Sequence, residues 1–367
     1  MAQATPTRVS QRSARKPRAC TITDEFTPIE RIADATAAMQ RALDLAELGP
    51  AVGANPRVGC VIADADGTVL GEGFHRGAGT PHAEVDALAN ASLRGNSVLG
   101  ATAFVTLEPC SHTGRTGPCT EALIEAGVAR VLYAVKDPNP AARGGASMLA
   151  QHGVDAQYSP REGAEALNHR WLHAMREGRP YVIAKWASTL DGRTAAADGT
   201  SFWITGEQAR AHAHHVRAGV DAILVGTQTV VVDDPQLSAR PSGVGDPHQP
   251  LRVVMGKRAT QGAALWRDDN VLALTMHDPL EVLHRLHERE VRSVLIEGGA
   301  TVTSAFVGAG LVDEVNAYIA PALLGSGPTA VHDLGIDTME KALRFKNVTV
   351  TQLGFDTLIT AHLLRGS

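Results

Sequence analysis

His82, Glu84, Cys110 and Cys119 are the residues of this chain whose types and spacing could do chemistry. One residue separates His82 from Glu84, and each cysteine directly follows a proline. One imidazole and two thiolates suit a zinc ion that keeps its fourth position open for water, and such an ion lowers the pKa of that water to about 7. A nearby glutamate can then carry protons from the water to a departing ammonia. The pattern predicts a zinc-dependent hydrolytic deaminase with Glu84 as its general acid and base.

The flanking segments predict how the fold positions these residues. Residues 84–89 read as a helix after the breaker Pro81, and residues 119–124 read as a helix after Pro118. A thiolate at a helix N-terminus is stabilised by the positive end of the helix dipole and by free backbone N–H groups. We therefore expect both halves of the metal site to lie at helix starts.

Each fragment taken alone has an ordinary explanation. A His-x-Glu triplet often arises by chance, and cysteines in a chain without a Cys-x-x-Cys pair can be plain buried thiols. The ordered combination, with a proline before each half, favours the functional interpretation. Cys20 and Cys60 have no such context, so we interpret them as a tail thiol and a core thiol.

Longer stretches of the N-terminal half resemble a known family, the bifunctional riboflavin-biosynthesis deaminase/reductases. The stretches are residues 55–60, 71–75, 81–85 and 106–119. The resemblance implies a cytidine-deaminase-like three-layer domain that deaminates a diaminopyrimidinone ribosyl phosphate. It also places four residues near that substrate, namely Asn55, His75, His112 and Arg115.

The types of these four residues agree with that role. An asparagine can recognise the amide edge of a ring, and histidines with an arginine can bind a ribose phosphate. From the residues alone a purely structural role is equally good. Asn55 before Pro56 is a common turn residue, and Arg115 can be a solvated loop charge.

The C-terminal half resembles the reductase part of the same family, whose fold is dihydrofolate-reductase-like. The stretches are residues 187–193, 201–204, 217–218, 226–230 and 233–237, so the likeness covers nearly everything after residue 27. It implies that NADPH reduces the ribosyl group to ribityl. The residues implied at NADPH are Ala187, Trp203, Thr229, Asp233, Gly299, Ala300, Thr301, Val302, Thr303 and Ser304. The residues implied at the substrate are Ser201, Arg217, Leu237, Arg240 and Glu297.

The residues of this half give partial support of their own. No Gly-x-Gly-x-x-Gly fingerprint follows a strand here. Residues 293–301 read as a strand that runs into two glycines and a helix, which lets N–H groups approach a phosphate but also serves plain packing. Arg217 and Arg240 can hold a sugar phosphate with their forked guanidinium groups, and Ser201 adds a hydroxyl donor. A proton donor for the reduction is not identified.

Alternating helical and strand patterns predict an α/β protein of layered domains. We expect helices at residues 29–48, 84–89, 119–124, 143–152 and 161–178. We expect strands at residues 58–63, 68–74, 103–107, 130–135 and 181–186, the first two forming a hairpin. Because Gly178 and Pro180 end the helix before residue 181, we place the deaminase domain at residues 28–177 and the reductase domain at residues 178–367.

The length and composition of the chain limit the kinds of protein that it can be. The chain has 367 residues, 44% of them hydrophobic, and a formal charge of only -5, which suits two globular domains without an electrostatic preference for nucleic acid. No apolar run is long enough to span a membrane, and the few cysteines favour a reducing cytoplasm. We expect zinc and NADPH as cofactors, a small-molecule substrate and, by analogy with the family, a homo-oligomer joined through the reductase domain.

We interpret the N-terminal tail and two groups of histidines structurally, without assigning them a function. Residues 1–27 are expected to be a disordered tail, although their basic start also resembles a transit peptide. His212, His214 and His215 do not share one face of a helix, so we interpret them, like the pair at 284 and 287, as a helix surface.

Two rival functions belong to other classes. A nucleobase or tRNA-editing deaminase with a non-catalytic C-terminal domain would share the zinc residues, but it usually has a Pro-Cys-x-x-Cys pair and, for RNA, a basic surface. A zinc-stabilised binding module would need a fourth protein ligand, for which His112 is the nearby candidate.

Overall fold

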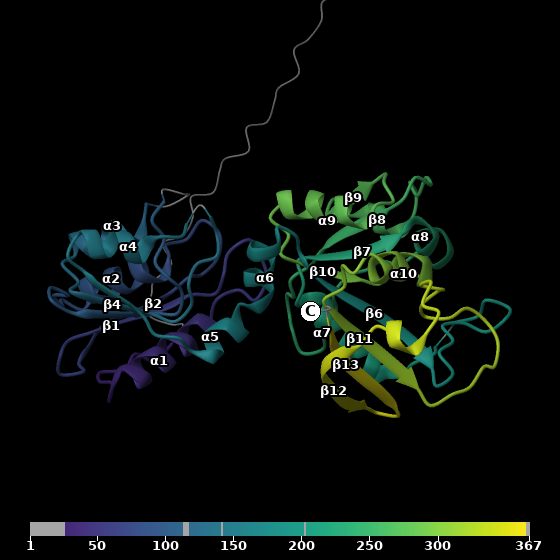
Figure 1. Ribbon diagram of the computed structural model, residues 1–367, viewed down its shortest axis with the longest axis horizontal. Helices are drawn as coiled ribbons and strands as arrows, with labels where there is room; N and C mark the ends of the chain where they lie inside the picture. Colours follow the sequence, from purple (N-terminus) through teal and green to yellow (C-terminus); the bar gives the residue numbers. More distant parts are fainter. Residues whose placement is uncertain (1–25, 113–116, 141, 202, 365–367) are drawn as a thin grey trace, which may run out of the picture.

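The computed structural model describes residues 26–112, 117–140, 142–201 and 203–364. The chain forms two α/β parts that lie side by side, with α6 (His169–Glu177) between them (Figure 1). Arg115, Cys20 and nearly all of the expected tail lie outside the described residues. Among those described, no helix is long and apolar enough to cross a bilayer.

The N-terminal part is built on a mixed sheet with the strand order β2-β1-β3-β4-β5. The strands are β1 (Gly59–Ala63), β2 (Val69–Phe74), β3 (Thr102–Val105), β4 (Arg130–Tyr133) and β5 (Asp155–Tyr158). β1 runs antiparallel to β2 and β3, while β3, β4 and β5 run parallel. The predicted hairpin and the next two strands are confirmed. β5 was not predicted, because its four residues lie mostly exposed at the sheet edge and carry little apolar signal.

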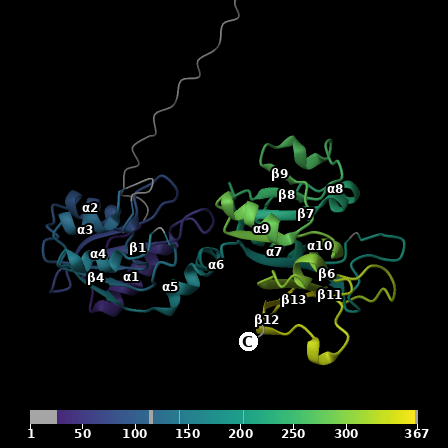
Figure 2. The same ribbon diagram turned by 45° about the horizontal axis from the view of Figure 1, so that its top comes forward.

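Helices cover both faces of this sheet, giving three layers (Figures 1 and 2). The helices are α1 (Ala35–Glu47), α2 (Ala83–Leu93), α3 (Cys119–Glu125), α4 (Gly145–Gln151) and α5 (Glu162–Leu167). Two glycines let helices pack closely on the sheet, since a Cβ at Gly59 would lie 1.9 Å from the Ala42 oxygen of α1. A Cβ at Gly73 would lie 2.3 Å from the Ala87 nitrogen of α2. Gly73 pairs with Cys60, the neighbour of Gly59, so α1 and α2 pack on opposite faces.

Two predicted helices differ from the structure for identifiable reasons. The helix expected over residues 29–48 begins only at Ala35, because the Asp34 carboxylate accepts a hydrogen bond from the Ala37 N–H at 2.8 Å and caps the first turn. The helix expected over residues 161–178 is broken at Asn168. The Asn168 side chain bonds the Arg57 N–H and carbonyl, both at 2.8 Å, and thereby ties α6 to the segment before β1.

The C-terminal part is built on a larger sheet with the order β12-β13-β11-β6-β10-β7-β8-β9. Its first four strands are β6 (Tyr181–Thr189), β7 (Ala222–Gly226), β8 (Leu251–Met255) and β9 (Val271–Leu274). The others are β10 (Ser293–Ile296), β11 (Glu314–Ala320), β12 (Phe345–Leu353) and β13 (Asp356–Leu363). The strands from β11 to β9 run parallel, whereas β13 and β12 form an antiparallel pair at one edge.

Alternate residues of the central strands feed two separate apolar cores. Val182 and Val294 face a core closed by α9 (Pro279–Glu288) and α10 (Ala300–Gly308). Ile183 and Leu295 face the opposite core. This core is completed by α7 (Glu207–Ala218), by α8 (Thr227–Asp233) and by Leu265 of the short 3-10 helix η1 (Ala264–Arg267). Because both faces of the sheet are covered, the strands read as continuous apolar runs. Because these strands are parallel, their carboxyl ends meet at one edge of the sheet, where polar residues gather.

Candidate functional site

The predicted metal ligands come together at two helix starts. His82 is the N-cap residue of α2 and Cys119 is the first residue of α3, as expected, while Cys110 lies in the loop after β3. The His82 Nδ1 lies 3.2 Å from the Cys119 Sγ and 3.5 Å from the Cys110 Sγ. The Cys119 backbone N–H donates to the Cys110 Sγ at 3.4 Å, so the helix N-terminus stabilises a thiolate there.

The electrostatics of this cluster favour a thiolate beside a protonatable carboxyl group. A hydrogen bond from Cys119 lowers the pKa of Cys110 against the effect of burial, and His82 lowers it further. Glu84 is 3% exposed, and burial together with the charge of Cys110 raises its pKa to about 7. Glu84 can therefore both accept and release a proton near neutral pH.

The donor set fits a catalytic zinc site. One nitrogen and two sulfur atoms, from His82, Cys110 and Cys119, lie within 4.8 Å of one another. In the described part of the chain no other ligand group joins them, and His112 is not part of this cluster. Three protein ligands leave the fourth position open for water, as catalytic zinc sites require.

Two of the zinc ligands, His82 and Cys110, line a cavity of about 300 Å³ that also contains three of the residues expected at the substrate. Asn55 and His75 form a pair, with 2.8 Å between the Asn55 Nδ2 and the His75 Nε2. The His75 Nδ1 lies 3.0 Å from the Pro81 carbonyl oxygen, which fixes the ring. The His112 Nδ1 is buried and meets no hydrogen-bond partner among the described residues, so it is available to a ligand.

Further polar residues line this cavity that were not predicted from the sequence. Glu108 and Asp137 follow β3 and β4, and burial raises the pKa of Asp137 to about 6. The Glu108 carboxylate accepts hydrogen bonds from the Asp137 N–H at 3.2 Å and the Ala146 N–H at 3.0 Å. Their position just beyond two neighbouring parallel strands is the signal that could have found them.

The reductase part holds a second polar cluster, centred on Glu297 just after β10. Arg217 donates to its carboxylate through Nε at 2.6 Å and through Nη2 at 2.7 Å. The Lys185 Nζ lies 3.8 Å from the same carboxylate and 5.5 Å from the centre of the Tyr318 ring. Burial alone would raise the pKa of Glu297, but Arg217 and Lys185 together lower it to about 2. Lys185 was not foreseen, although a lysine inside an otherwise apolar strand is a usable signal.

The glycine turn predicted after β10 is confirmed as a strand-to-helix turn. Gly299 is the N-cap residue of α10, and its N–H lies 3.3 Å from the Thr229 Oγ1 of α8. A Cβ at Gly298 would lie 2.8 Å from the Val302 Cβ. The two helix starts are therefore packed together at the carboxyl ends of β7 and β10, and Ser304 accepts a hydrogen bond from the His332 N–H at 2.7 Å.

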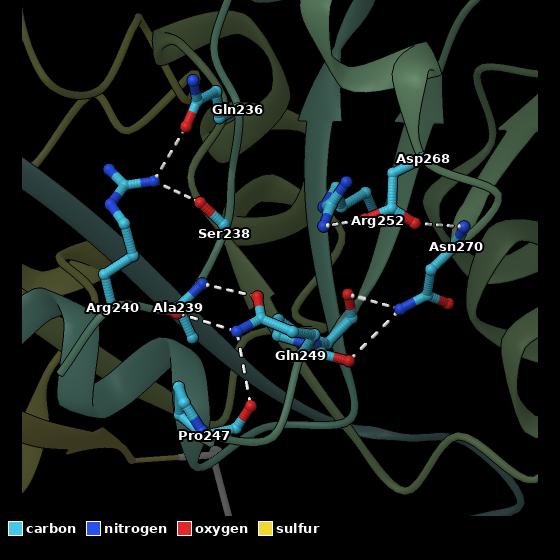
Figure 3. A network of polar contacts seen from close by, with 10 residues as sticks. Gln236, Ser238, Ala239, Arg240, Pro247, Gln249, Arg252, Asp268 and Asn270 are labelled. Carbon is cyan, nitrogen blue, oxygen red and sulfur yellow. Dashed lines mark hydrogen bonds and ion pairs between the residues drawn. The ribbon is translucent and has the colours of Figure 1, made fainter. Parts of the chain in front are cut away.

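The other residues expected in the reductase site lie in different surroundings. Arg240 is exposed and its Nη1 contacts the Gln236 Oε1 at 3.1 Å and the Ser238 hydroxyl (Figure 3). Gln249 braces the same loop by accepting from the Ala239 N–H at 3.0 Å (Figure 3). The Leu237 side chain is buried in the core, which leaves its backbone for ligand contacts. The exposed members of the expected set are Ser201, Trp203, Asp233, Gly299 and Thr301, and the half-buried members are Ala187, Thr229, Ala300, Val302 and Ser304.

Two histidines of α7 are less exposed than the sequence suggested. The His212 Nδ1 lies 2.8 Å from the Tyr318 hydroxyl, and the His214 Nδ1 accepts from the Arg240 N–H at 3.3 Å. Both are half-buried because α7 packs over the sheet, so the surface interpretation is wrong for them, whereas His215 is exposed. They form no metal-binding group within the described ranges.

The fold and the two sites together define a bifunctional enzyme, a zinc-type deaminase joined to an α/β reductase. The family model described as the cytidine and deoxycytidylate deaminase zinc-binding region matches residues 33–135. The model described as the RibD C-terminal domain matches residues 180–359.

Individual relatives match both halves at once. "Riboflavin biosynthesis protein RibD" of Mycobacterium tuberculosis is 46% identical over 310 residues, which cover 83% of this chain and 90% of that protein. The protein of the same description from Escherichia coli is 39% identical and covers 89% of this chain and 98% of its own. The solved structure of Acinetobacter baumannii RibD superposes with a TM-score of 0.82 at 39% identity, covering 90% of this chain and 99% of that one. The chain belongs to the RibD family of riboflavin biosynthesis proteins, which are deaminases and reductases that use zinc and NADPH.

Proposed function

We propose that the N-terminal domain hydrolyses the 2-amino group from a diaminopyrimidinone ribosyl phosphate, and that the C-terminal domain then reduces the ribosyl group to ribityl with NADPH. A Thermotoga maritima structure described as a diaminohydroxyphosphoribosylaminopyrimidine deaminase and 5-amino-6-(5-phosphoribosylamino)uracil reductase supports this order. It is 31% identical and superposes with a TM-score of 0.76.

In the deaminase domain the chain's own residues bind the metal, hold the ring and move protons. His82, Cys110 and Cys119 would hold a zinc ion, which when bound would supply a water activated for attack on the ring carbon. Glu84 accepts the proton of that water and delivers it to the departing ammonia, a role supported by its pKa of about 7 and its place in the same cavity.

The remaining cavity residues recognise the substrate in this proposal. Asn55, held by His75, reads the amide edge of the pyrimidine ring. His112 contacts the ribose phosphate, which its buried unpartnered Nδ1 supports. His75 acts at the substrate through Asn55, because its two ring nitrogens are already engaged by Asn55 and the Pro81 carbonyl. Arg115, which lies outside the described residues, is proposed as a further phosphate ligand from the resemblance alone.

In the reductase domain the chain positions two molecules while NADPH supplies the hydride. The α10 start, with residues Gly299 to Ser304, binds the cofactor phosphates, and Thr229 fixes Gly299 there. Ala300 and Thr301 supply the backbone N–H groups, because those of Val302 and Thr303 already bond the Gly299 carbonyl. Ala187, Trp203 and Asp233 complete the NADPH site. The residues proposed for the ribosyl substrate are Ser201, Arg217, Leu237, Arg240 and Glu297. Because Glu297 already engages the fork of Arg217, the exposed Arg240 is the arginine left to hold the phosphate.

We place the division between the domains at Gly178, so that the deaminase covers residues 28–177 and the reductase residues 178–367. Gly178 ends α6 with a φ of +65°, and β6 begins three residues later. The folded part also includes Phe26, whose ring packs edge-on against Phe74 with 6.2 Å between the ring centres.

We also propose a homo-oligomer joined through the reductase domain, in a reducing cytoplasm. β12 is an edge strand whose outward Val348 and Val350 are 57% and 65% exposed, which is an unusual apolar surface for a free sheet edge. Light scattering should give a multiple of 38.6 kDa for the wild type and a lower mass for Val350→Lys. The three described cysteines are free thiols, as a reducing compartment requires.

The observation that carries the deaminase proposal is the three-ligand cluster at the wall of the cavity that also contains Glu84. The test is to give the purified protein the diaminopyrimidinone ribosyl phosphate and to follow ammonia release and NADPH oxidation, with and without a zinc chelator. Ammonia release that the chelator abolishes, followed by NADPH oxidation only after deaminated product has formed, is the expected result. Ammonia without NADPH oxidation would refute the reductase half, and neither signal would refute both.

A further inference from the structure

The deaminase cavity has a wall that comes from the reductase domain. Its lining includes the zinc ligand His82 and the proton carrier Glu84 from one domain, and Glu290 and Arg292 from the other. The two latter residues lie between α9 and β10, far from Glu84 in the sequence. The cavity is therefore complete only when the two domains are docked.

One carboxylate holds this wall in place. The Asp221 Oδ2 accepts hydrogen bonds from the Arg292 N–H at 3.2 Å and from the Ser293 N–H at 2.8 Å. The Asp221 Oδ1 accepts from the Gly53 N–H at 2.6 Å, two residues before Asn55 in the deaminase domain. The backbone of Arg292 and the loop that carries Asn55 are thus fixed to the same side chain.

The guanidinium group of Arg292 is poorly satisfied by the protein itself. Its Nε reaches the Ala54 carbonyl oxygen at 3.4 Å, and its Nη1 reaches the His287 carbonyl oxygen at 3.4 Å, both long for hydrogen bonds. Within the described part of the chain Nη2 forms no hydrogen bond and Arg292 forms no ion pair. Burial lowers the pKa of Arg292, although an arginine stays charged at neutral pH.

The acidic groups deeper in the cavity do not neutralise this charge. Glu108 already accepts two backbone N–H groups, and Asp137 accepts the Asn139 N–H at 2.8 Å. The charges of Glu290 and Asp221 act on Arg292 and raise its pKa against the effect of burial, but among the described residues neither carboxylate forms an ion pair with its guanidinium. A half-buried guanidinium without a direct ion pair is costly, and its planar fork matches the oxygens of a phosphate. The charge is therefore suited to an anionic group that enters with the ligand.

We propose that Arg292 is a substrate-binding residue of the deaminase, supplied by the reductase domain, and that it binds the phosphate of the pyrimidine ribosyl phosphate. The inference rests on the proposed function, because it takes the phosphorylated pyrimidine as the occupant of the cavity. It gives the fusion of the two domains a chemical consequence: deamination of the phosphorylated substrate depends on the docked reductase domain.

The test compares Arg292→Ala with Arg289→Ala in the full-length, zinc-loaded protein. Arg289 is the matched control, since it is an exposed arginine three residues away that does not line the cavity. Each variant receives the diaminopyrimidinone ribosyl phosphate and the same riboside without its phosphate. NADPH oxidation with the deaminated phosphate serves as the measure of correct folding.

Arg292→Ala should raise the KM for the phosphorylated substrate about 10- to 100-fold, as expected for the loss of charged hydrogen bonds, with kcat nearly unchanged. Its activity on the riboside should equal that of the wild type, and Arg289→Ala should match the wild type on both. Arg292→Lys, which keeps the charge but loses the fork, should fall between the two. Inorganic phosphate should inhibit the wild type competitively and inhibit Arg292→Ala more weakly.

Equal losses on the two substrates, or no loss on either, would overturn the assignment of Arg292. Ammonia release by the wild type checks the proposed function separately. If the wild type deaminates the phosphorylated substrate and Arg292→Ala treats both substrates alike, the assignment fails while the proposed function stands.

Discussion

Arg217 and Glu297 form a two-point ion pair at the centre of the proposed reductase site, with N–O distances of 2.6 and 2.7 Å. The pair joins α7 to the end of β10, and the Glu297 side chain is 7% exposed. Two nearly parallel charged hydrogen bonds fix the guanidinium plane, so Arg217 orients the carboxylate and the carboxylate orients Arg217. The pair is thus a rigid element of the site in which we propose that the substrate and NADPH bind.

Replacing Glu297 with glutamine should destabilise the protein in a pH-dependent way. The pKa of Glu297 lies at about 2, below the ordinary value of 4.5, so its ionisation stabilises the fold above pH 4.5. That stabilisation is lost as the pH falls from 4.5 towards 2. The variant should lose about 3–5 kcal/mol at pH 7, because Arg217 is left buried without its partner, and the difference should shrink below pH 4.5. Urea unfolding of both proteins from pH 7 to pH 3 measures this.

Glu288→Gln is the control for that experiment. It removes a glutamate that pairs with Arg285 at 3.4 Å, but the two side chains are 64% and 54% exposed. An exposed pair contributes less than about 1 kcal/mol, so this variant should unfold like the wild type at every pH. A Glu297→Gln variant that also behaves like the wild type would contradict the stabilising role given to the Arg217–Glu297 pair.

Glu84→Gln should separate proton transfer from metal binding. Glutamine keeps the size of the side chain but cannot carry a proton, so the deamination rate should fall about 10²- to 10⁴-fold. Zinc content should stay at one per chain, because His82, Cys110 and Cys119 are unchanged. Ammonia assays and metal analysis of the same sample measure both. A variant that keeps its activity would remove Glu84 from the mechanism.

Cys119→Ala should remove the metal and the deaminase activity together. Cys119 is fully buried at the start of α3, and its Sγ lies 3.2 Å from the His82 Nδ1. Its loss therefore leaves only two metal ligands and an unfilled space beside them. Cys60→Ala is the matched control, since Cys60 is equally buried but packs in the core against Gly73 of β2. Metal analysis should find zinc in the control alone, and both variants should still oxidise NADPH with the deaminated substrate. Zinc retained by Cys119→Ala would show that another residue ligates it.

Local signals in the sequence were enough for the metal cluster and for most of the elements around it. His82 and Cys119 were found because each stands at a helix start next to a proline, which is a pattern of neighbouring residues. Glu108 and Asp137 were missed because their importance depends on which strand ends lie side by side. That information belongs to the sheet order, not to any stretch of sequence.

The domain interface was beyond sequence reasoning for the same reason. Nothing near Arg292 in the chain indicates that its side chain faces the cavity of another domain. The contact arises because Asp221 accepts hydrogen bonds from Gly53 as well as from Arg292, across a separation of 168 residues for Gly53. The helix break at Asn168 has a similar cause, since Asn168 bonds Arg57 in the segment before β1. The Asp221 contacts depend on how the domains dock, and the Asn168 contact depends on how the N-terminal domain folds on itself.

Gly298→Ala should weaken NADPH binding while leaving the deaminase intact. The new Cβ would lie 2.8 Å from the Val302 Cβ and 3.1 Å from its Cγ1, so the start of α10 must move away from the end of β10. Overpacking of this kind costs about 1–3 kcal/mol, and a displaced helix start no longer aims its N–H groups at a phosphate. The Kd for NADPH, measured by fluorescence, should rise roughly tenfold. Gly308→Ala, at the other end of α10, meets its nearest atom only at 3.8 Å and should bind NADPH normally. Normal binding by Gly298→Ala, or equal weakening in both variants, would contradict the placement of the cofactor at this helix start.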